Sequence, residues 1–255
     1  MTGEKYLSLV KKASLEAGAA IMEVYESADF EVDQKKDDSP LTLADRKAHE
    51  CIVAHLKTTD LPILSEEGKQ LSYEERKNWD TFWMVDPLDG TKEFIKKNGE
   101  FTVNIALIHQ GKAVLGVVSA PVLKELYYGM AGKGAFLETE GNSPIALAIE
   151  NTEVKQIVAS RSHLNEDTKA FMEKYPTANT VSMGSSLKFM LVVKNEAQIY
   201  PRFAPTMEWD TAAAQAIVEA AGGEVLRYPE LEPLQYNRED LLNPYFLVKS
   251  KSLKI

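Results

Sequence analysis

The sequence predicts a layered protein of mixed class, α+β in its first half and α/β in its second. Two observations support this prediction. Amphipathic helices open the chain and lead into a β-rich stretch at residues 100–137, and after residue 155 short strands and helices alternate. The polar residues 138–155 separate the two patterns. We therefore expect an N-terminal domain at 1–150 and a C-terminal domain at 151–255.

The first half begins with two expected helices. Residues 4–26 carry apolar side chains at helical spacing, and a second helix is expected from Thr42 to Lys57, after the break at Ser39-Pro40. Residues 70–80 are highly charged and are expected to be helical or loop. Strands are expected at 61–64, 81–85, 101–109, 113–121, 127–130 and 134–137, with a hairpin turn at Gln110-Gly111-Lys112.

In the second half, segments with strand periodicity alternate with segments with helix periodicity. Its expected strands are 156–159, 180–183 and 197–201, and its expected helices are 166–174, 186–194 and 209–221. Gly222-Gly223 ends the last of these helices, as glycine commonly does.

Composition narrows the class of function. The 255 residues are 44% hydrophobic and 26% charged, which is ordinary for a globular protein. The net charge of -9 argues against a uniformly basic face for a nucleic-acid polymer. Cys51 is the single cysteine, so no internal disulfide can form. We see no signal peptide or transmembrane segment in the sequence and expect a cytoplasmic location.

The run Asp86-Pro87-Leu88-Asp89-Gly90-Thr91 is the central polar feature. It follows an apolar strand, and a proline that stiffens the turn lets its two carboxylates aim at one point. Glycine permits close approach of the backbone to a ligand, and Thr91 could begin a helix whose free N–H groups suit an anion. The alternative is an aspartate-rich turn that caps itself.

Four more acidic residues occupy similar positions. Glu66 and Glu67 follow a short strand, and Asp45 and Asp210 lie in the first turns of expected helices, where capping alone would explain them. If they converged, two carboxylates about 4 Å apart would repel by roughly 4 kcal/mol. Such a cluster either takes up protons or binds a cation, and an all-oxygen ligand set selects magnesium or manganese.

Four segments together resemble the inositol monophosphatase superfamily, in its order and near its spacing. They are Ser39-Pro40-Leu41-Thr42-Leu43-Ala44-Asp45, Ile63-Leu64-Ser65-Glu66-Glu67-Gly68, Trp83-Met84-Val85-Asp86-Pro87-Leu88-Asp89-Gly90-Thr91 and Glu208-Trp209-Asp210-Thr211-Ala212-Ala213. The match covers nearly the whole chain, without departure at the acidic positions. The resemblance implies an α-β-α-β-α layered fold of the inositol monophosphatase and fructose bisphosphatase type.

The resemblance also implies the roles of individual residues. The metal ligands are expected to be Glu66, Asp86, the Leu88 carbonyl, Asp89 and Asp210, holding two or three Mg²⁺ ions for which Mn²⁺ can substitute. Thr91, backed by Asp45, is expected to orient or deprotonate the attacking water. Glu67 is expected to be a neighbour of the site.

Within the superfamily, three segments resemble the 3′(2′),5′-bisphosphate nucleotidase branch. They are Gly90-Thr91-Lys92-Glu93-Phe94, Gly184-Ser185-Ser186-Leu187-Lys188-Phe189 and Ala159-Ser160-Arg161-Ser162-His163. The expected substrate contacts are Gly90, Thr91, His163, Gly184, Ser185, Lys188 and Asp210. Residues 184–186 lead into a helix and could hold a second phosphate, with Lys188 adding charge. Alternatively, Lys188 is a solvated helix lysine and His163 is an ordinary loop histidine. Arg202 has no assigned role.

The implied reaction is direct hydrolysis of adenosine 3′,5′-bisphosphate to AMP and phosphate. Its sulfated relative, 3′-phosphoadenylyl sulfate, is a second expected substrate, and lithium an expected inhibitor. The rival functions are an inositol or sugar monophosphatase on the same scaffold and a non-catalytic metal- and nucleotide-binding protein. For the oligomeric state, a monomer and a homodimer are both compatible with the sequence. Some members of the superfamily are peripheral to the inner membrane, but this sequence contains no basic amphipathic helix to support that location.

Overall fold

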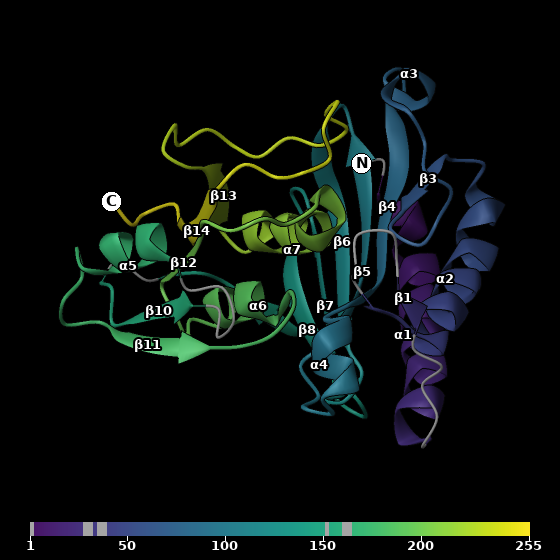
Figure 1. Ribbon diagram of the computed structural model, residues 1–255, viewed down its shortest axis with the longest axis horizontal. Helices are drawn as coiled ribbons and strands as arrows, with labels where there is room; N and C mark the ends of the chain where they lie inside the picture. Colours follow the sequence, from purple (N-terminus) through teal and green to yellow (C-terminus); the bar gives the residue numbers. More distant parts are fainter. Residues whose placement is uncertain (1–2, 28–32, 35–39, 151–152, 160–164) are drawn as a thin grey trace.

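Five layers follow one another across the molecule: a helix pair, a large sheet, a second helical layer, a smaller sheet and an outer helix (Figure 1). The structure is a computed structural model that describes residues 3–27, 33–34, 40–150, 153–159 and 165–255. The observed order confirms the α-β-α-β-α arrangement that the resemblance implied.

The first layer contains α1 (Leu7–Glu26) and α2 (Leu43–Leu56), which pack against each other and against the large sheet. Short 3₁₀ turns, η1 (Glu4–Tyr6) and η2 (Lys57–Thr59), precede α1 and follow α2. Five apolar residues of α1 are buried because they recur at helical spacing, namely Val10, Ala13, Ala17, Ile21 and Val24. Both expected helices are confirmed to within a few residues.

The large sheet has seven strands within the described residues, in the order β3-β4-β5-β6-β7-β8-β9. Only the β3–β4 pair is parallel. The bounds are β3 (Ile63–Ser65), β4 (Thr81–Asp89), β5 (Thr102–His109), β6 (Lys112–Ala120), β7 (Glu125–Met130), β8 (Gly134–Thr139) and β9 (Ile145–Leu147). Gln110 and Gly111 both have positive φ, as a two-residue hairpin turn requires.

One expectation for this sheet was wrong, and one of its strands was not expected. Strand β4 does not end at Val85 but continues through Pro87 to Asp89, and its register with β5 shifts between Asp86 and Asp89. That irregularity accommodates a proline, which has no N–H for the ladder. The supposed boundary region contains β9, which pairs with β8. The charged stretch contains α3 (Tyr73–Arg76).

The second sheet has five strands within the described residues, in the order β11-β10-β12-β14-β13. Their bounds are β10 (Gln156–Ala159), β11 (Asn179–Ser182), β12 (Ile199–Arg202), β13 (Gly223–Arg227) and β14 (Phe246–Ser250). The antiparallel strands β13 and β14 had not been expected from the sequence. A separate two-residue pair joins β1 (Asp33–Gln34) to β2 (Pro40–Leu41).

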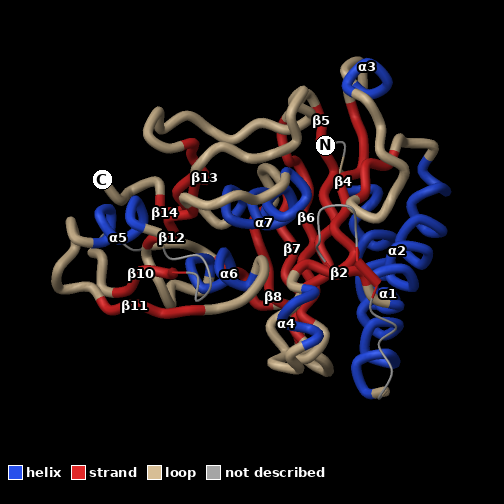
Figure 2. The backbone as a smooth tube through the Cα atoms, viewed as in Figure 1, coloured by secondary structure: helices blue, strands red, loops and turns tan. Residues whose placement is uncertain are grey.

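Between the sheets lie α6 (Leu187–Val193) and α7 (Glu208–Ala220), while α5 (Glu166–Met172) packs on the far side of the small sheet (Figure 2). Helix α7 contacts both sheets, and glycines on the large sheet permit its close approach. A Cβ on Gly116 would lie 2.0 Å from the carbonyl oxygen of Ala213 in α7. The division of the chain at residue 150 stays a prediction.

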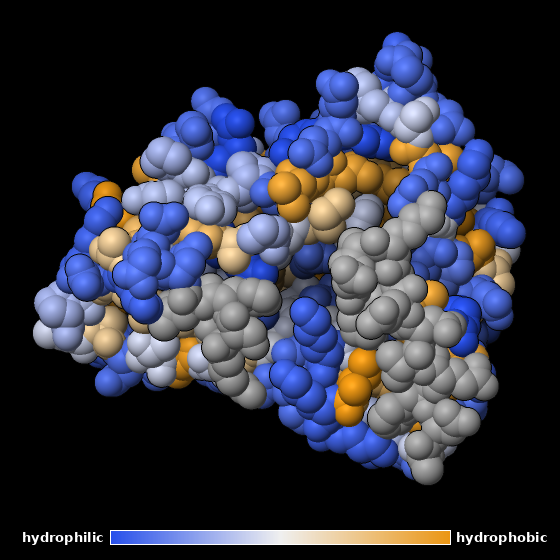
Figure 3. Space-filling view, viewed as in Figure 1, coloured by the Kyte–Doolittle hydropathy of each residue, from blue (hydrophilic) through white to orange (hydrophobic). Residues whose placement is uncertain are grey.

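The face of the molecule seen in Figure 3 is mainly hydrophilic, with hydrophobic residues in scattered patches. None of the helices in the described residues combines the length and apolar character that crossing a membrane requires.

Candidate active site

Three carboxylates lie where β3 and β4 end. Because these strands are parallel neighbours, their carboxyl ends share one edge of the sheet, and the Glu66 N–H donates to the Val85 carbonyl at 3.1 Å. Asp86 is buried, and its Oδ1 accepts the Leu88 N–H at 3.1 Å. Asp89 follows at the end of the irregular part of β4. The β3–β4 pairing therefore brings Glu66 to the motif that contains both aspartates.

Asp210 reaches this cluster from the second helical layer. It lies in the first turn of α7, where its Oδ2 accepts the Met207 N–H at 2.8 Å. The hydroxyl of Ser186 lies 2.9 Å from Asp89 Oδ2 and 3.0 Å from the Asp210 carbonyl. A single side chain thus connects the β4 carboxylates to the start of α7.

The electrostatics of the site follow from this grouping of acids. Burial raises the pKa of Asp86 well above its ordinary value, and the Glu66, Asp89 and Asp210 carboxylates raise it further. Burial likewise raises the pKa of Asp210, followed by the influence of Asp89 and Glu66. A cation among them would offset both the repulsion and the loss of hydration. The all-oxygen donor set fits a hard divalent ion.

Asp45 has two roles that the sequence presented as alternatives. It belongs to the capping box of α2, since its Oδ2 accepts the Thr42 N–H at 2.7 Å. Its Oδ1 accepts the Thr91 hydroxyl at 3.2 Å, and that hydroxyl also lies 3.3 Å from the Leu88 carbonyl. The structure therefore joins Asp45 to Leu88 and Thr91, which lie far from it in the sequence.

Gly90 connects β4 to α4 (Thr91–Ile95). Its φ of 95° lies in the left-handed region, and a Cβ there would lie 3.0 Å from the Glu100 carbonyl oxygen and 3.3 Å from the Ser185 Cβ. Any other residue would strain this turn and push the 184–186 segment away. The glycine thus sets the distance between the acidic motif and the expected second phosphate site.

A cavity of about 330 Å³ opens beside the carboxylates, large enough for a small ligand. Its lining includes the acidic residues Asp89 and Asp210 together with Lys188, Tyr200 and Arg202. Lys188 is buried, and its Nζ donates to the Met183 carbonyl at 3.3 Å. Burial lowers the pKa of Lys188 to about 8, and the nearby Asp89 carboxylate partly opposes that shift.

The alternative of a solvated Lys188 is therefore wrong. Residues 184–186 lead into a helix as expected, since α6 begins at Leu187. The Gly184 N–H, however, already donates to Glu100 Oε2 at 2.7 Å. Ser185 lines the cavity with a positive φ of 43°. His163 lies outside the described residues.

Two residues on β5 were missed by the sequence reasoning. Asn104 pairs across the strands with Asp86, and Thr102 pairs with Asp89. The Asn104 amide donates to the Ser186 hydroxyl at 3.0 Å and lies 3.4 Å from Asp89 Oδ2. The sequence pattern could have indicated them, because Thr102 and Asn104 are polar residues two positions apart in an apolar strand and must therefore lie on the same face of the sheet.

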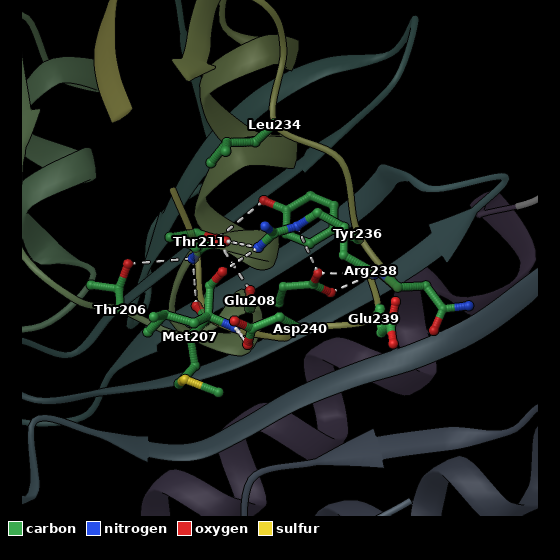
Figure 4. A network of polar contacts seen from close by, with 12 residues as sticks. Thr206, Met207, Glu208, Thr211, Leu234, Tyr236, Arg238, Glu239 and Asp240 are labelled. Atoms are coloured by element: carbon green, nitrogen blue, oxygen red, sulfur yellow. Dashed lines mark hydrogen bonds and ion pairs between the residues drawn. The ribbon is translucent and has the colours of Figure 1, made fainter. Parts of the chain in front are cut away.

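A polar network holds the start of α7 in place (Figure 4). The buried Glu208 carboxylate accepts the N–H groups of Asn237 at 2.7 Å and Arg238 at 3.1 Å, and also the Arg238 Nε at 3.1 Å. Burial raises the pKa of Glu208 to about 7, while these donors lower it. The network anchors the helix turn that carries Asp210, a role the sequence did not indicate.

Comparisons with known proteins agree with this geometry. A model of the "Inositol monophosphatase family" matches residues 4–253. The 3′(2′),5′-bisphosphate nucleotidase CysQ of Salmonella typhimurium is 49% identical over 246 residues, covering 95% of this chain and 98% of that protein. The crystal structure of CysQ from Bacteroides thetaiotaomicron superimposes with a TM-score of 0.88 at 47% identity, covering 97% of this chain and 98% of the other.

More distant structures share the fold. The inositol monophosphatase of Anabaena has a TM-score of 0.77 at 23% identity, covering 99% of this chain and 93% of that one. At that identity the likeness extends to the fold alone.

Proposed function

Because the chain belongs to the inositol monophosphatase family, we propose that it is a Mg²⁺-dependent phosphomonoesterase that acts on adenosine 3′,5′-bisphosphate. One observation carries the proposal. The carboxylates of Asp89 and Asp210 line a cavity that also contains the buried cationic side chains of Lys188 and Arg202. Glu66, directly after β3, and Asp86, in the neighbouring strand β4, adjoin them. A phosphate ester with a second anionic group matches such a site.

Mg²⁺ would be held by Glu66, Asp86, Asp89 and Asp210 together with the Leu88 carbonyl, and two or three ions are expected. When bound, the metal supplies Lewis-acid activation of water and neutralises charge on the phosphate. Mn²⁺ is expected to substitute because it accepts the same oxygen ligands.

The Asp45–Thr91 pair would position the nucleophile. The Thr91 hydroxyl, held by Asp45 Oδ1, would hydrogen-bond to the attacking water. As the water attacks phosphorus, the Thr91 oxygen would accept its proton while the Thr91 proton passes to Asp45. The bond between phosphorus and the ribose 3′-oxygen would break at the same time, and that oxygen would take a proton from solvent and leave as the 3′-hydroxyl of AMP. The first N–H groups of a helix have no intrahelical partner, so those at the start of α4 would contact the phosphoryl oxygens.

Lys188 and Arg202 would bind the second phosphate. Both are buried, and both line the cavity that Asp89 and Asp210 border. Arginine can meet a phosphate with two parallel hydrogen bonds, and lysine contributes a point charge. 3′-Phosphoadenylyl sulfate, which keeps an anionic group at this position, would be a second substrate. Lithium would inhibit, because a small monovalent cation can enter a magnesium site without matching its charge.

The test is phosphate release from adenosine 3′,5′-bisphosphate and inositol 1-phosphate, measured side by side with Mg²⁺. The proposal predicts a higher kcat/KM for the nucleotide. Preference for the inositol ester would keep the carboxylate chemistry but contradict the second phosphate site. No release from either ester by folded protein would contradict the proposal as a whole.

A further inference from the structure

Glu16, Cys51 and His55 form a cluster on the helix pair, away from the carboxylates of the active site. Cys51 and His55 are four residues apart on α2 and therefore share one face, and Glu16 projects from α1. One ligand atom from each side chain lies within 4.8 Å of those of the other two. The His55 Nε2 and Glu16 Oε2 atoms are 2.6 Å apart.

We propose that Glu16, Cys51 and His55 bind a thiophilic divalent cation, with Zn²⁺ as the first candidate. Thiolate, imidazole and carboxylate are the ligand types that zinc takes in proteins. Three protein ligands would leave a fourth tetrahedral position for water. Zinc–ligand bonds of about 2.0–2.3 Å place neighbouring ligand atoms roughly 3.5 Å apart, so small side-chain rotations convert the present arrangement into a binding one.

The surroundings allow the ion to enter. The side chain of Glu16 is 49% exposed and that of His55 is 20% exposed, whereas Cys51 is half-buried. Burial raises the pKa of the Cys51 thiol, and the Glu16 carboxylate raises it further, so metal binding must release the thiol proton. Lys12 lies 3.7 Å from Glu16 Oε1 and would compete for the carboxylate.

This site is distinct from the active site in place and in chemistry. His55 lies ten residues after Asp45 on α2, about 15 Å along the helix axis. The active-site donors are oxygen atoms, whereas Cys51 is the only thiol in the chain. A cation bound here would join α1 to α2 and stabilise the outer helical layer.

Cobalt provides a selective probe, because a thiolate bound to Co²⁺ gives a near-ultraviolet charge-transfer band that oxygen ligands do not give. The full-length protein is titrated with Co²⁺ in excess Mg²⁺, which keeps the carboxylate site occupied. We expect the band to saturate at one ion per chain and to disappear when Zn²⁺ is added. Cys51→Ser should abolish the band, and His55→Ala and Glu16→Gln should each weaken binding about tenfold or more.

Matched variants separate this site from other metal binding. His109→Ala removes a histidine elsewhere and Asp86→Asn alters the active site, and both should keep the band at full strength. Zn²⁺ should also raise the unfolding midpoint of the Asp86→Asn protein, but not that of the Asp86→Asn/Cys51→Ser double variant. Absence of the band would overturn the proposal. A band that is unchanged in His55→Ala and Glu16→Gln would overturn it too, by showing thiol binding alone.

Discussion

Asp45 and Asp210 each cap a helix and, in the proposed function, also serve the active site. One carboxylate oxygen of each accepts a backbone N–H at the start of its helix. Such a cap fixes the side-chain rotamer, and the rest of the carboxylate is then held in place relative to the active site. The helix-capping interpretation and the catalytic interpretation of these residues are therefore compatible, because a cap makes a good support for a reacting group.

Replacement of Thr91 by valine tests the nucleophile-positioning pair. The change keeps the shape of the side chain but removes the hydroxyl that contacts Asp45. We expect kcat for adenosine 3′,5′-bisphosphate to fall by about 10²- to 10⁴-fold, the usual range for loss of a general-base interaction. Thr91→Ser retains the hydroxyl and should keep most of the activity. Equal loss in both variants would indicate a packing role.

Lys188→Met tests the second phosphate site. The methionine side chain is similar in length to that of lysine and suits a buried position, but it has no positive charge. We expect KM for adenosine 3′,5′-bisphosphate to rise by roughly 10- to 150-fold, which corresponds to a charged hydrogen bond of about 1.5–3 kcal/mol. KM for inositol 1-phosphate should stay within about twofold, since that ester has no second phosphate. Equal changes for both esters, measured by initial rates, would contradict the assignment.

The pH dependence of KM gives an independent check on Lys188. Its folded-state pKa is lowered to about 8, so the ammonium is charged below that pH and neutral above it. Affinity for the bisphosphate should therefore be highest below pH 8 and should decline as pH rises through it. In Lys188→Met this decline should disappear. A wild-type KM that is constant between pH 7 and about 9 would contradict the assignment.

Helices and strands with strong periodicity could be predicted from the sequence, but the way they pack together and bring distant residues to one site could not. Helices α1 and α2 and the hairpin at Gln110–Gly111 follow from local pattern. The continuation of β4 past Pro87 depends on a register shift that only its partner strand determines. The burial of Lys188 depends on the packing of α6 between the sheets. The proximity of Asp210 to Asp86 could be predicted only from the family resemblance, because sequence periodicity gives no information on long-range distances.

The packing of α7 on the large sheet predicts a strong effect of Gly116→Ala. The new Cβ would overlap the backbone of α7 at Ala213. Neither β6 nor α7 can move away without disturbing the close packing of the helix on the large sheet. We expect the free energy of unfolding in urea to fall by about 1–3 kcal/mol or more, with lower activity because Asp210 lies on the same helix.

Gly141→Ala is the control for this substitution. It adds a Cβ with no atom within 4 Å at a turn whose φ is 76°, so it reports backbone strain alone. A Gly116→Ala protein as stable as the wild type would contradict the close packing of α7.

The candidate active site exists only because three layers meet. Asp45 comes from the outer helix pair, Glu66, Asp86 and Asp89 from the large sheet, and Asp210 from the helical layer between the sheets. The fold therefore holds like charges together that would separate in an unfolded chain. In the proposed function a bound divalent cation would compensate that repulsion, so metal binding and activity should depend on each other.

The most direct test measures phosphate release from adenosine 3′,5′-bisphosphate with Mg²⁺, after chelation, and after Mg²⁺ is restored. Asp86→Asn is assayed in parallel, with circular dichroism to establish that it is folded. We predict that activity is lost on chelation, returns with Mg²⁺, and is absent from Asp86→Asn under all three conditions. Activity that persists in the chelated wild type, or full activity in folded Asp86→Asn, would contradict a metal-dependent reaction at these carboxylates.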